Sequence, residues 1–217
     1  MSRPYRILSI DGGGSWALIP VKALMSIYTE DTKGHRVLSD FDYVVANSGG
    51  SLVVAGLMKN LSLSEILDLF KSEVTRERMF SRSCAEMLSP LMIVGLNAKY
   101  STERKLVALQ DMFGDDGKKA LCDFNIPAKN GGYVKFSFMS YHYDRERACF
   151  FRSFKSKAGA SGSEPSRSSL AEVVHASTNA PIRYFDEPAL VHIGAGVERF
   201  WDGAVAGYNN PVLSAAV

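Results

Sequence analysis

The stretch from Phe41 to Gly56, FDYVVANSGGSLVVAG, constrains the fold of this chain more than any other part of the sequence. An apolar run, Phe41 to Ala46, leads into Asn47-Ser48-Gly49-Gly50, and a second apolar run with helical potential follows from Ser51 to Met58. A strand, a serine followed by glycines and a helix, in that order, are typical of a nucleophile elbow, which exposes a serine hydroxyl at the end of a sheet. The helix behind such a turn directs its N-terminal N–H groups and the positive end of its dipole at the same place.

The match to the elbow consensus is incomplete. The consensus is Gly-x-Ser-x-Gly, and Ala46 occupies the first glycine position here. Glycines beside the serine still allow backbone and substrate to approach closely. Taken alone, the same stretch also fits a serine–glycine turn that only opens a buried helix. Both interpretations stay open until the rest of the chain is considered.

The composition excludes several classes of protein. The chain has 217 residues, enough for one domain with a substantial core, and its net charge of +2 gives no basic surface for nucleic acid. Its cysteines, Cys84, Cys122 and Cys149, are odd in number and widely spaced, which favours reduced thiols over a disulfide framework or zinc site. We expect no signal peptide, because Met1 to Pro4 leads straight into the first predicted strand, and no apolar run approaches the roughly 20 residues of a spanning helix. We expect a cytoplasmic protein that can contact membranes peripherally.

The end of the sequence has the pattern of a helix start. Asn209-Asn210-Pro211 places a proline in the first turn, and the apolar stretch Val212 to Val217 follows. This stretch is either a short terminal helix or the beginning of a longer segment. We favour the second interpretation, in which the domain is truncated at its C-terminal end.

Two successive strand–loop–helix units indicate an α/β fold. Tyr5 to Ile10 is a strand by composition, a glycine-rich loop follows, and Trp16 to Tyr28 carries apolar residues at helical spacing. After a polar connection, Glu30 to Asp40, the elbow stretch forms the second unit. Such a repetition predicts a parallel sheet with helices on its faces.

The later elements follow from caps and alternation. Capping boxes predict helices that begin after Ser62 and Ser169. The remaining expected elements are a helix over 102–113, strands over 133–141 and 148–154, and a hairpin over 189–201. Thr75 to Tyr100 predicts an irregular or helical insertion that either packs in the core or covers the active face as a lid. Lys155 to Ser168 predicts a mobile loop, with Lys155, Lys157 and Arg167 available to anionic lipid.

Three sequence features follow predicted strands and supply the groups that acyl transfer needs. They are Gly12-Gly13-Gly14, Ser48 and Asp202. Ligands of α/β sheets bind at the carboxyl ends of the strands. Ser48 is a candidate nucleophile, and Asp202 is a candidate base that would deprotonate it. The N–H groups of Gly12, Gly13 and Gly14 are candidate donors to the oxyanion of a tetrahedral intermediate.

Five blocks in this order resemble the patatin-like phospholipases. They are IDGGG (10–14), FDYVVANSGGSLVVA (41–55), KYSTERKLVALQDMFGD (99–115), VVHASTNAPIRYF (173–185) and WDGAVAGYNNP (201–211). The resemblance implies a single patatin-like catalytic domain over residues 1–217, folded as a three-layer α/β/α sandwich around a mostly parallel sheet. It also implies a phospholipase A-type lipid acyl hydrolase with a Ser48–Asp202 dyad and an oxyanion hole at Gly12, Gly13 and Gly14.

The resemblance also defines the expected partners. The substrate is a membrane phospholipid or another lipid ester, reached by peripheral membrane contact, and no cofactor, metal or nucleic acid is expected. A protein or small-molecule activator is compatible with the family. At two points the sequence departs from the pattern: Trp16 and Ala17 stand where a basic residue and a glycine are usual, and Ala46 replaces the first elbow glycine.

Two alternatives stay open, and the departures bear on the first of them. One is a weakly active or inactive interaction module on the same fold. The other is an actin-like nucleotide-binding protein, in which IDGGGS and Asp202-Gly203-Ala204 serve as phosphate loops. A Ser-His-Asp triad is not expected, because His175 lies on a helix face and His192 lies within an apolar strand, as a core or half-buried residue. Asp11 is interpreted as structural, turning the glycine loop.

Overall fold

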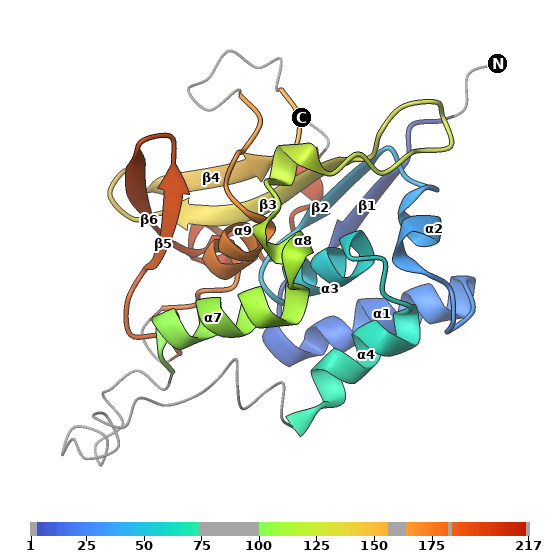
Figure 1. Cartoon of the computed structure of the whole chain (residues 1–217), viewed down its shortest axis with the longest axis horizontal. Coiled ribbons are helices and arrows are strands. Elements are labelled where there is room, and N and C mark those ends of the chain that lie inside the picture. Colours follow the sequence, from blue (N-terminus) through green and yellow to red (C-terminus); the bar gives the residue numbers. More distant parts are fainter. Residues whose placement is uncertain (1–3, 74–99, 156–163, 182–183, 216–217) are drawn as a thin grey trace.

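A computed structural model describes residues 4–73, 100–155, 164–181 and 184–215 of the chain (Figure 1). The expected insertion between residues 75 and 100 lies outside these residues, except for Tyr100. Most of the loop expected between Lys155 and Ser168 lies outside them as well. In the described ranges, no helix combines the length and the apolar composition that crossing a membrane requires.

The centre of the fold is one sheet. Its strands are β1 (Ile7–Ile10), β2 (Tyr43–Ala46), β3 (Lys135–His142), β4 (Arg147–Arg152), β5 (Ala189–Ile193) and β6 (Gly196–Asp202). β1, β2 and β3 are parallel neighbours, whereas β4 and β6 pair with β3 in antiparallel orientation and β5 pairs with β6 as the expected hairpin. The sequence therefore predicted the parallel core correctly, and the antiparallel strands extend it.

Strands β2 and β6 share one edge of β3. Ala46 lies opposite Phe138, and Asp202 lies opposite Ser140. Because β4 pairs with residues 137–142, it occupies the other edge of β3 and leaves a single edge for both partners. β2 runs parallel to β3 and β6 runs antiparallel to it, so their carboxyl ends face each other. This junction brings together two segments that are far apart in the sequence.

Helices cover the sheet unequally on its two faces. They are η1 (Gly14–Ala17), α1 (Leu18–Ile27), α2 (Gly34–Leu38), α3 (Gly49–Met58), α4 (Leu63–Lys71), α7 (Thr102–Phe113), α8 (Asp115–Lys118), η3 (Leu121–Asp123), α9 (Leu170–Ser177), η4 (Gly203–Ala206) and α10 (Val212–Ala215). Figure 1 shows α1, α3, α4, α7 and α9 gathered on one side of the sheet. η4 and α10 pack against β1, β2 and β3 on the other side.

The alternation of side chains along the strands divides the core between these faces. Val44 and Phe136 belong to the large core beneath α3 and α9, whereas Tyr43, Val45 and Met139 form a small cluster on the opposite face. A strand places successive side chains on opposite faces, so an apolar run such as β2 is buried on both. The α/β class with helices against a mostly parallel central sheet is thus confirmed.

The local predictions agree with the structure where sequence patterns are strong. Both capping boxes are present: Ser62 and Glu65 exchange hydrogen bonds at the start of α4, and Ser169 and Glu172 do so at the start of α9. One prediction is wrong, because the polar connection between Glu30 and Asp40 contains the short helix α2. It forms because Val37 and Leu38 are buried in the large core, a tertiary effect that local polarity does not reveal.

Candidate active site

Ser48 occupies a strained turn between β2 and α3. Its backbone has φ 50° and ψ −128°, a region that residues other than glycine rarely adopt. The glycines that follow are required by close packing: a Cβ on Gly49 would lie 2.3 Å from Gly14 O, and one on Gly50 would lie 2.5 Å from Ile10 O. The strand–turn–helix geometry is that of a nucleophile elbow, and Ser48 is half-buried among fully buried neighbours.

The positions that depart from the family pattern differ in their surroundings. Ala46 is fully buried in the large core, so its methyl group is accommodated there. Ala17 is also buried, and a Cβ at Gly49 would lie 3.0 Å from its Cβ. Trp16, in contrast, is 71% exposed and lines a cavity next to Ser48.

Asp202 ends β6 and faces Ser48 across the junction of β2 and β6. It is only 2% exposed. Its Oδ1 accepts hydrogen bonds from Ala204 N at 2.9 Å and from Asn47 Nδ2 at 3.1 Å, and the Ser48 side chain is close enough to lower the pKa of the carboxyl group. Burial raises the pKa of Asp202 above its ordinary value, and these hydrogen bonds act in the opposite direction. A carboxylate with a raised pKa is a better proton acceptor than an exposed aspartate.

Asn47 is a member of the site that the sequence analysis did not single out. It is fully buried, and its Nδ2 donates to Asp202 while its Oδ1 has no partner among the described residues. A Cβ on Gly203 would lie 2.5 Å from that Oδ1, so Gly203 is needed for Asn47 to fit. The only indication in the sequence is the position of Asn47 directly before the serine.

The three glycines of the first loop have different surroundings. Gly12 N donates to Asn209 O at 2.7 Å, and a Cβ on Gly12 would lie 2.9 Å from Ser48 Cβ. Gly12 therefore permits close approach of the loop and its N–H is already used. Gly13 and Gly14, with φ of 129° and 59°, are exposed and line the cavity beside Ser48. In the described part of the chain their N–H groups have no protein acceptor.

The C-terminal end of α9 and the two residues after it bind the backbones of both members of the predicted dyad. Ser48 N donates to Ser177 O at 3.1 Å and lies 3.2 Å from Ser177 Oγ, which also bonds with Ser51 Oγ at 2.8 Å. Asp202 N donates to Asn179 O at 3.0 Å. We refer to Ser177–Asn179 as the clamp segment. The clamp segment belongs to the block 173–185, for which the family resemblance implied no catalytic role.

Ser48 and Asp202 line a cavity of about 590 Å³. Most of its wall is apolar and comes from α3, α4, α7 and the residues before β5: Leu52, Leu69, Phe70, Met112, Tyr184 and Phe185. Its polar wall includes Ser15, Lys105, Thr178 and Asn209. An apolar cavity with a few convergent polar groups suits a ligand that has a long apolar part and one polar reactive group.

The histidines take no part in this site. His175 is buried, and burial holds its pKa well below its usual value, but it does not line the cavity. His192 was expected in the core or half-buried, and this was wrong, since its side chain is 75% exposed and pairs with Glu172 at 2.6 Å. The alternation of β5 turns it outward, whereas Val191 is buried.

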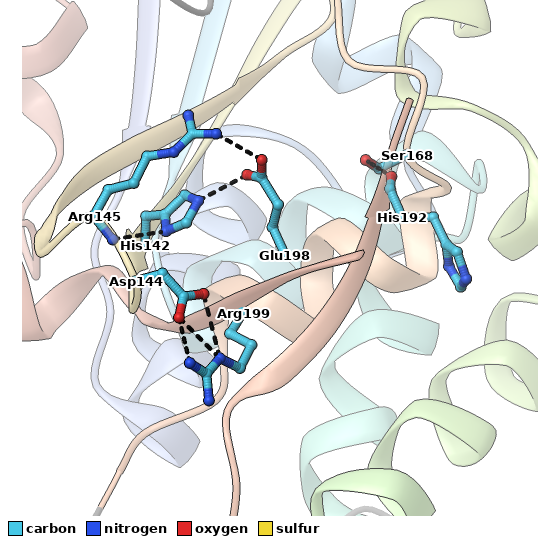
Figure 2. A network of polar contacts seen from close by, with 7 residues as sticks. All are labelled: His142, Asp144, Arg145, Ser168, His192, Glu198 and Arg199. Carbon is cyan, nitrogen blue, oxygen red and sulfur yellow. Dashed lines mark hydrogen bonds and ion pairs between the residues drawn. The ribbon is translucent and has the colours of Figure 1, made fainter. Parts of the chain in front are cut away.

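The two hairpins carry a separate polar network (Figure 2). His142 Nε2 lies 2.7 Å from Glu198, which also pairs with Arg145 at 2.7 Å, and Arg199 pairs with Asp144. None of these residues lines the cavity. The network joins β3–β4 to β5–β6.

Asp11 is exposed and its carboxylate accepts a hydrogen bond from Asn210 Nδ2 at 3.4 Å. It does not line the cavity. This contact links the glycine loop to the segment before α10, which agrees with a structural role.

A family model matches this chain over most of its length, and individual proteins resemble it as well. The family model described as patatin-like phospholipase matches residues 8–216. An intracellular phospholipase A2 of Caenorhabditis elegans is 29% identical over 108 residues, which are 50% of this chain and 8% of that protein. Among solved structures, VipD from Legionella pneumophila has a TM-score of 0.48 at 12% identity, over 94% of this chain and 47% of that one. The chain thus spans under half the length of each of these relatives.

Proposed function

The chain belongs to the patatin-like phospholipase family, and we propose that it is a phospholipase A-type lipid acyl hydrolase that uses Ser48 as nucleophile and Asp202 as base. One observation carries this proposal: Ser48, in its strained turn, and the buried Asp202 carboxylate lie on the wall of the same apolar cavity. We also propose that the chain forms a single catalytic domain, because all elements of the site come from one sheet and its helices.

The first half of the reaction acylates Ser48. Asp202 accepts the hydroxyl proton while Ser48 Oγ attacks the ester carbonyl, and the carbonyl π electrons move to the oxygen. Gly13 and Gly14 donate their N–H groups to this oxyanion, and each such donor is worth on the order of 10²–10³ in rate in well-studied enzymes. The intermediate collapses, the ester C–O bond breaks, and the leaving alkoxide takes the proton from Asp202.

The second half releases the fatty acid. A water molecule gives its proton to the Asp202 carboxylate and attacks the acyl carbonyl, so a second oxyanion forms at the same donors. When this intermediate collapses, the bond to Ser48 Oγ breaks and the serine recovers its proton from Asp202. The carboxylate begins and ends the cycle ionised, as its hydrogen bonds from Ala204 and Asn47 favour.

The cavity supports a lipid substrate. Its apolar wall suits an acyl chain, and Ser48 and Asp202 on the same wall would meet the ester group of a lipid bound there. Trp16, 71% exposed at the cavity, is a residue type that favours membrane–water interfaces. We therefore propose peripheral contact with a membrane reached from the cytoplasm, a location that the name of the nematode relative also suggests.

Labelling with a fluorophosphonate probe tests this function directly. We expect the wild-type protein to be labelled, Ser48→Ala to be unlabelled, and Asp202→Asn to be labelled at least 10²-fold more slowly, since a serine without its base is a weak nucleophile. Labelling that persists in Ser48→Ala would contradict the assignment. An unlabelled wild-type protein would favour the inactive interaction module on the same fold. A thermal shift caused by ATP would favour the nucleotide-binding alternative, which the family match over residues 8–216 disfavours.

A further inference from the structure

Lys105 is a buried lysine that the chemistry above does not use. It lies on α7, is 1% exposed and lines the cavity that Ser48 and Asp202 share. Lysine is among the residues least often fully buried, because its ammonium group loses hydration there. The site must therefore compensate a substantial desolvation penalty at this position.

The partners of Lys105 are oxygens and an aromatic ring. Its Nζ donates to Asn179 Oδ1 at 2.8 Å and to His175 O at 3.1 Å, and it lies 4.0 Å from the centre of the Phe185 ring. His175 O belongs to the last turn of α9, where the negative end of the helix dipole favours a cation. The ring face of Phe185 attracts the same charge. All three contacts suit an ammonium group.

Asn179 connects Lys105 to the base. Its side-chain Oδ1 accepts from Lys105, its backbone O accepts from Asp202 N, and its Nδ2 donates to Glu187 O at 2.7 Å. Asn179 also ends the clamp segment, whose other end holds the backbone of Ser48. Lys105 therefore bonds directly to the clamp segment, which in turn binds the backbone N–H groups of Ser48 and Asp202.

Asp202 is the carboxylate that acts on Lys105. Burial lowers the pKa of Lys105 well below its ordinary value, and Asp202 opposes this effect; Lys105 in turn lowers the pKa of Asp202. Three other titratable groups are near: His175 on α9, and Asp186 and Glu187 before β5. Burial and Lys105 keep His175 neutral, whereas Asp186 accepts hydrogen bonds from Thr102 N and Glu187 N.

We propose that Lys105 is a positioning residue of the hydrolytic site: it anchors the clamp segment through Asn179 and places its amino group on the cavity wall that Asp202 shares, where it acts on that carboxyl group. This inference rests on the proposed function of Ser48 and Asp202. It assigns Lys105 an electrostatic role that a purely structural lysine would not have.

The test is the pH dependence of fluorophosphonate labelling in Lys105→Met. Removal of the positive neighbour raises the pKa of Asp202, so the acidic limb of the rate profile moves upward by about one pH unit. At a pH on that limb, the rate falls about tenfold. Lys105→Arg keeps the charge and is expected to leave the limb in place. A limb that stays unchanged in Lys105→Met would overturn the inference and leave the proposed function intact.

Lys59→Met is the matched control. Lys59 Nζ donates to Phe113 O at 2.9 Å, so it also caps a carbonyl in the last turn of a helix, here α7, but it does not line the cavity. We expect Lys59→Met to lower stability without moving the acidic limb. If it moves the limb equally, the effect of Lys105 is general destabilisation and the inference is wrong.

A measurement without catalysis separates the two proposals. The ¹³C signal of the Asp202 carboxyl group, assigned with Asp202→Asn, is titrated in wild type and in Lys105→Met. A higher titration midpoint in the variant supports the inference even if wild type is never labelled, in which case only the proposed function fails. Equal midpoints overturn it. If Lys105→Met does not fold, Lys105→Gln replaces it, because glutamine retains a hydrogen-bond donor without the charge.

Discussion

Asp202 is a buried carboxylate, and this has a consequence for stability. Its folded-state pKa is raised above the ordinary value of 3.8, mainly by burial. A raised folded-state pKa means that folding favours the protonated carboxyl group. Its contribution to the free energy of unfolding is fully present below the unfolded-state pKa and is lost as the pH rises through the folded-state pKa. We therefore expect Asp202→Asn to unfold at a higher temperature than wild type at pH 8, with a smaller difference at pH 4.

Calorimetry at both pH values checks this expectation, and hydrolysis is measured in parallel. Asparagine Oδ1 can still accept hydrogen bonds from Ala204 and Asn47. The substitution therefore changes stability mainly by removing a buried charge and not by removing hydrogen bonds. The variant would be more stable and inactive, a trade-off that is common at active sites. If Asp202→Asn gains less in melting temperature over wild type at pH 8 than at pH 4, the ionised Asp202 carboxylate does not destabilise the fold.

The glycine loop offers a second test at the residue scale. Gly12→Ala places a methyl group 2.3 Å from Asn209 Oδ1 and 2.9 Å from Ser48 Cβ, so we expect a loss of about 1–3 kcal/mol in unfolding free energy and a severe loss of labelling. Gly14→Ala meets no atom within 4 Å but has φ of 59°. Its expected cost is about 1–2 kcal/mol of backbone strain, with a smaller loss of labelling.

Urea unfolding and labelling rates for the two variants decide the roles of these glycines. The two positions differ because the N–H of Gly12 already donates to Asn209 O, whereas the N–H of Gly14 has no acceptor among the described residues. Neither substitution removes the N–H of residue 14. If Gly12→Ala labels as fast as wild type, the loop does not approach Ser48 as closely as the structure indicates. If Gly14→Ala loses more labelling than Gly12→Ala, loop conformation matters more than steric fit.

At the scale of elements, the C-terminal end of α9 supports the turn that holds the nucleophile. Ser177→Ala removes the hydroxyl that bonds with Ser51 Oγ and lies 3.2 Å from Ser48 N. Because Ser51 Oγ is left buried without this partner, we expect a loss of about 1–3 kcal/mol in unfolding free energy. We also expect slower labelling of Ser48, since the elbow loses part of its support.

Ser169→Ala provides a control on the same helix. Ser169 caps the N-terminal end of α9, away from the dyad, and its loss is expected to cost about 1 kcal/mol of stability. Both variants would therefore be destabilised, but only Ser177→Ala would label more slowly under conditions where both are folded. Equal labelling rates would mean that the clamp segment serves stability alone.

The elements themselves could largely be predicted from sequence because their local patterns are strong. Capping boxes, helical spacing and alternation located α4, α9 and the β5–β6 hairpin. α2 and the outward orientation of His192 could not be predicted in this way, because each depends on which face meets the core. Local sequence does not contain that information.

The candidate site was predictable in its parts but not in its assembly. Strand ends and glycines indicated Ser48, Asp202 and the glycine loop, and their catalytic roles stay predictions. The meeting of β2 and β6 along one edge of β3 is a property of topology. Lys105 was hidden for a similar reason, since its burial depends on Asn179, His175 and Phe185, which are distant in sequence. For Asn47, the sequence shows its position beside the serine but does not show that its side chain bonds to Asp202.

At the scale of the whole molecule, the exposed apolar side chain at the cavity predicts how the protein meets its substrate. Trp16 occupies a position where the family usually has a basic residue, and it is 71% exposed beside Ser15 and Ser48 on the cavity wall. Burial of part of an indole side chain in a bilayer interface contributes about 1.4 kcal/mol, equivalent to about tenfold in affinity. We therefore expect Trp16→Ala to bind phospholipid vesicles about tenfold more weakly.

The prediction separates membrane contact from chemistry. Trp16→Ala is expected to lose hydrolysis of vesicle lipids in parallel with vesicle binding, but to retain hydrolysis of a soluble short-chain ester, because Ser48 and Asp202 are untouched. Ile27→Ala is the control: Ile27 is 73% exposed at the far end of α1 and does not line the cavity. Co-sedimentation with vesicles and an assay of each substrate measure these effects. Equal losses on both substrates would instead place Trp16 in the ester-binding part of the cavity, and equal vesicle binding by Trp16→Ala and Ile27→Ala would exclude a specific membrane contact there.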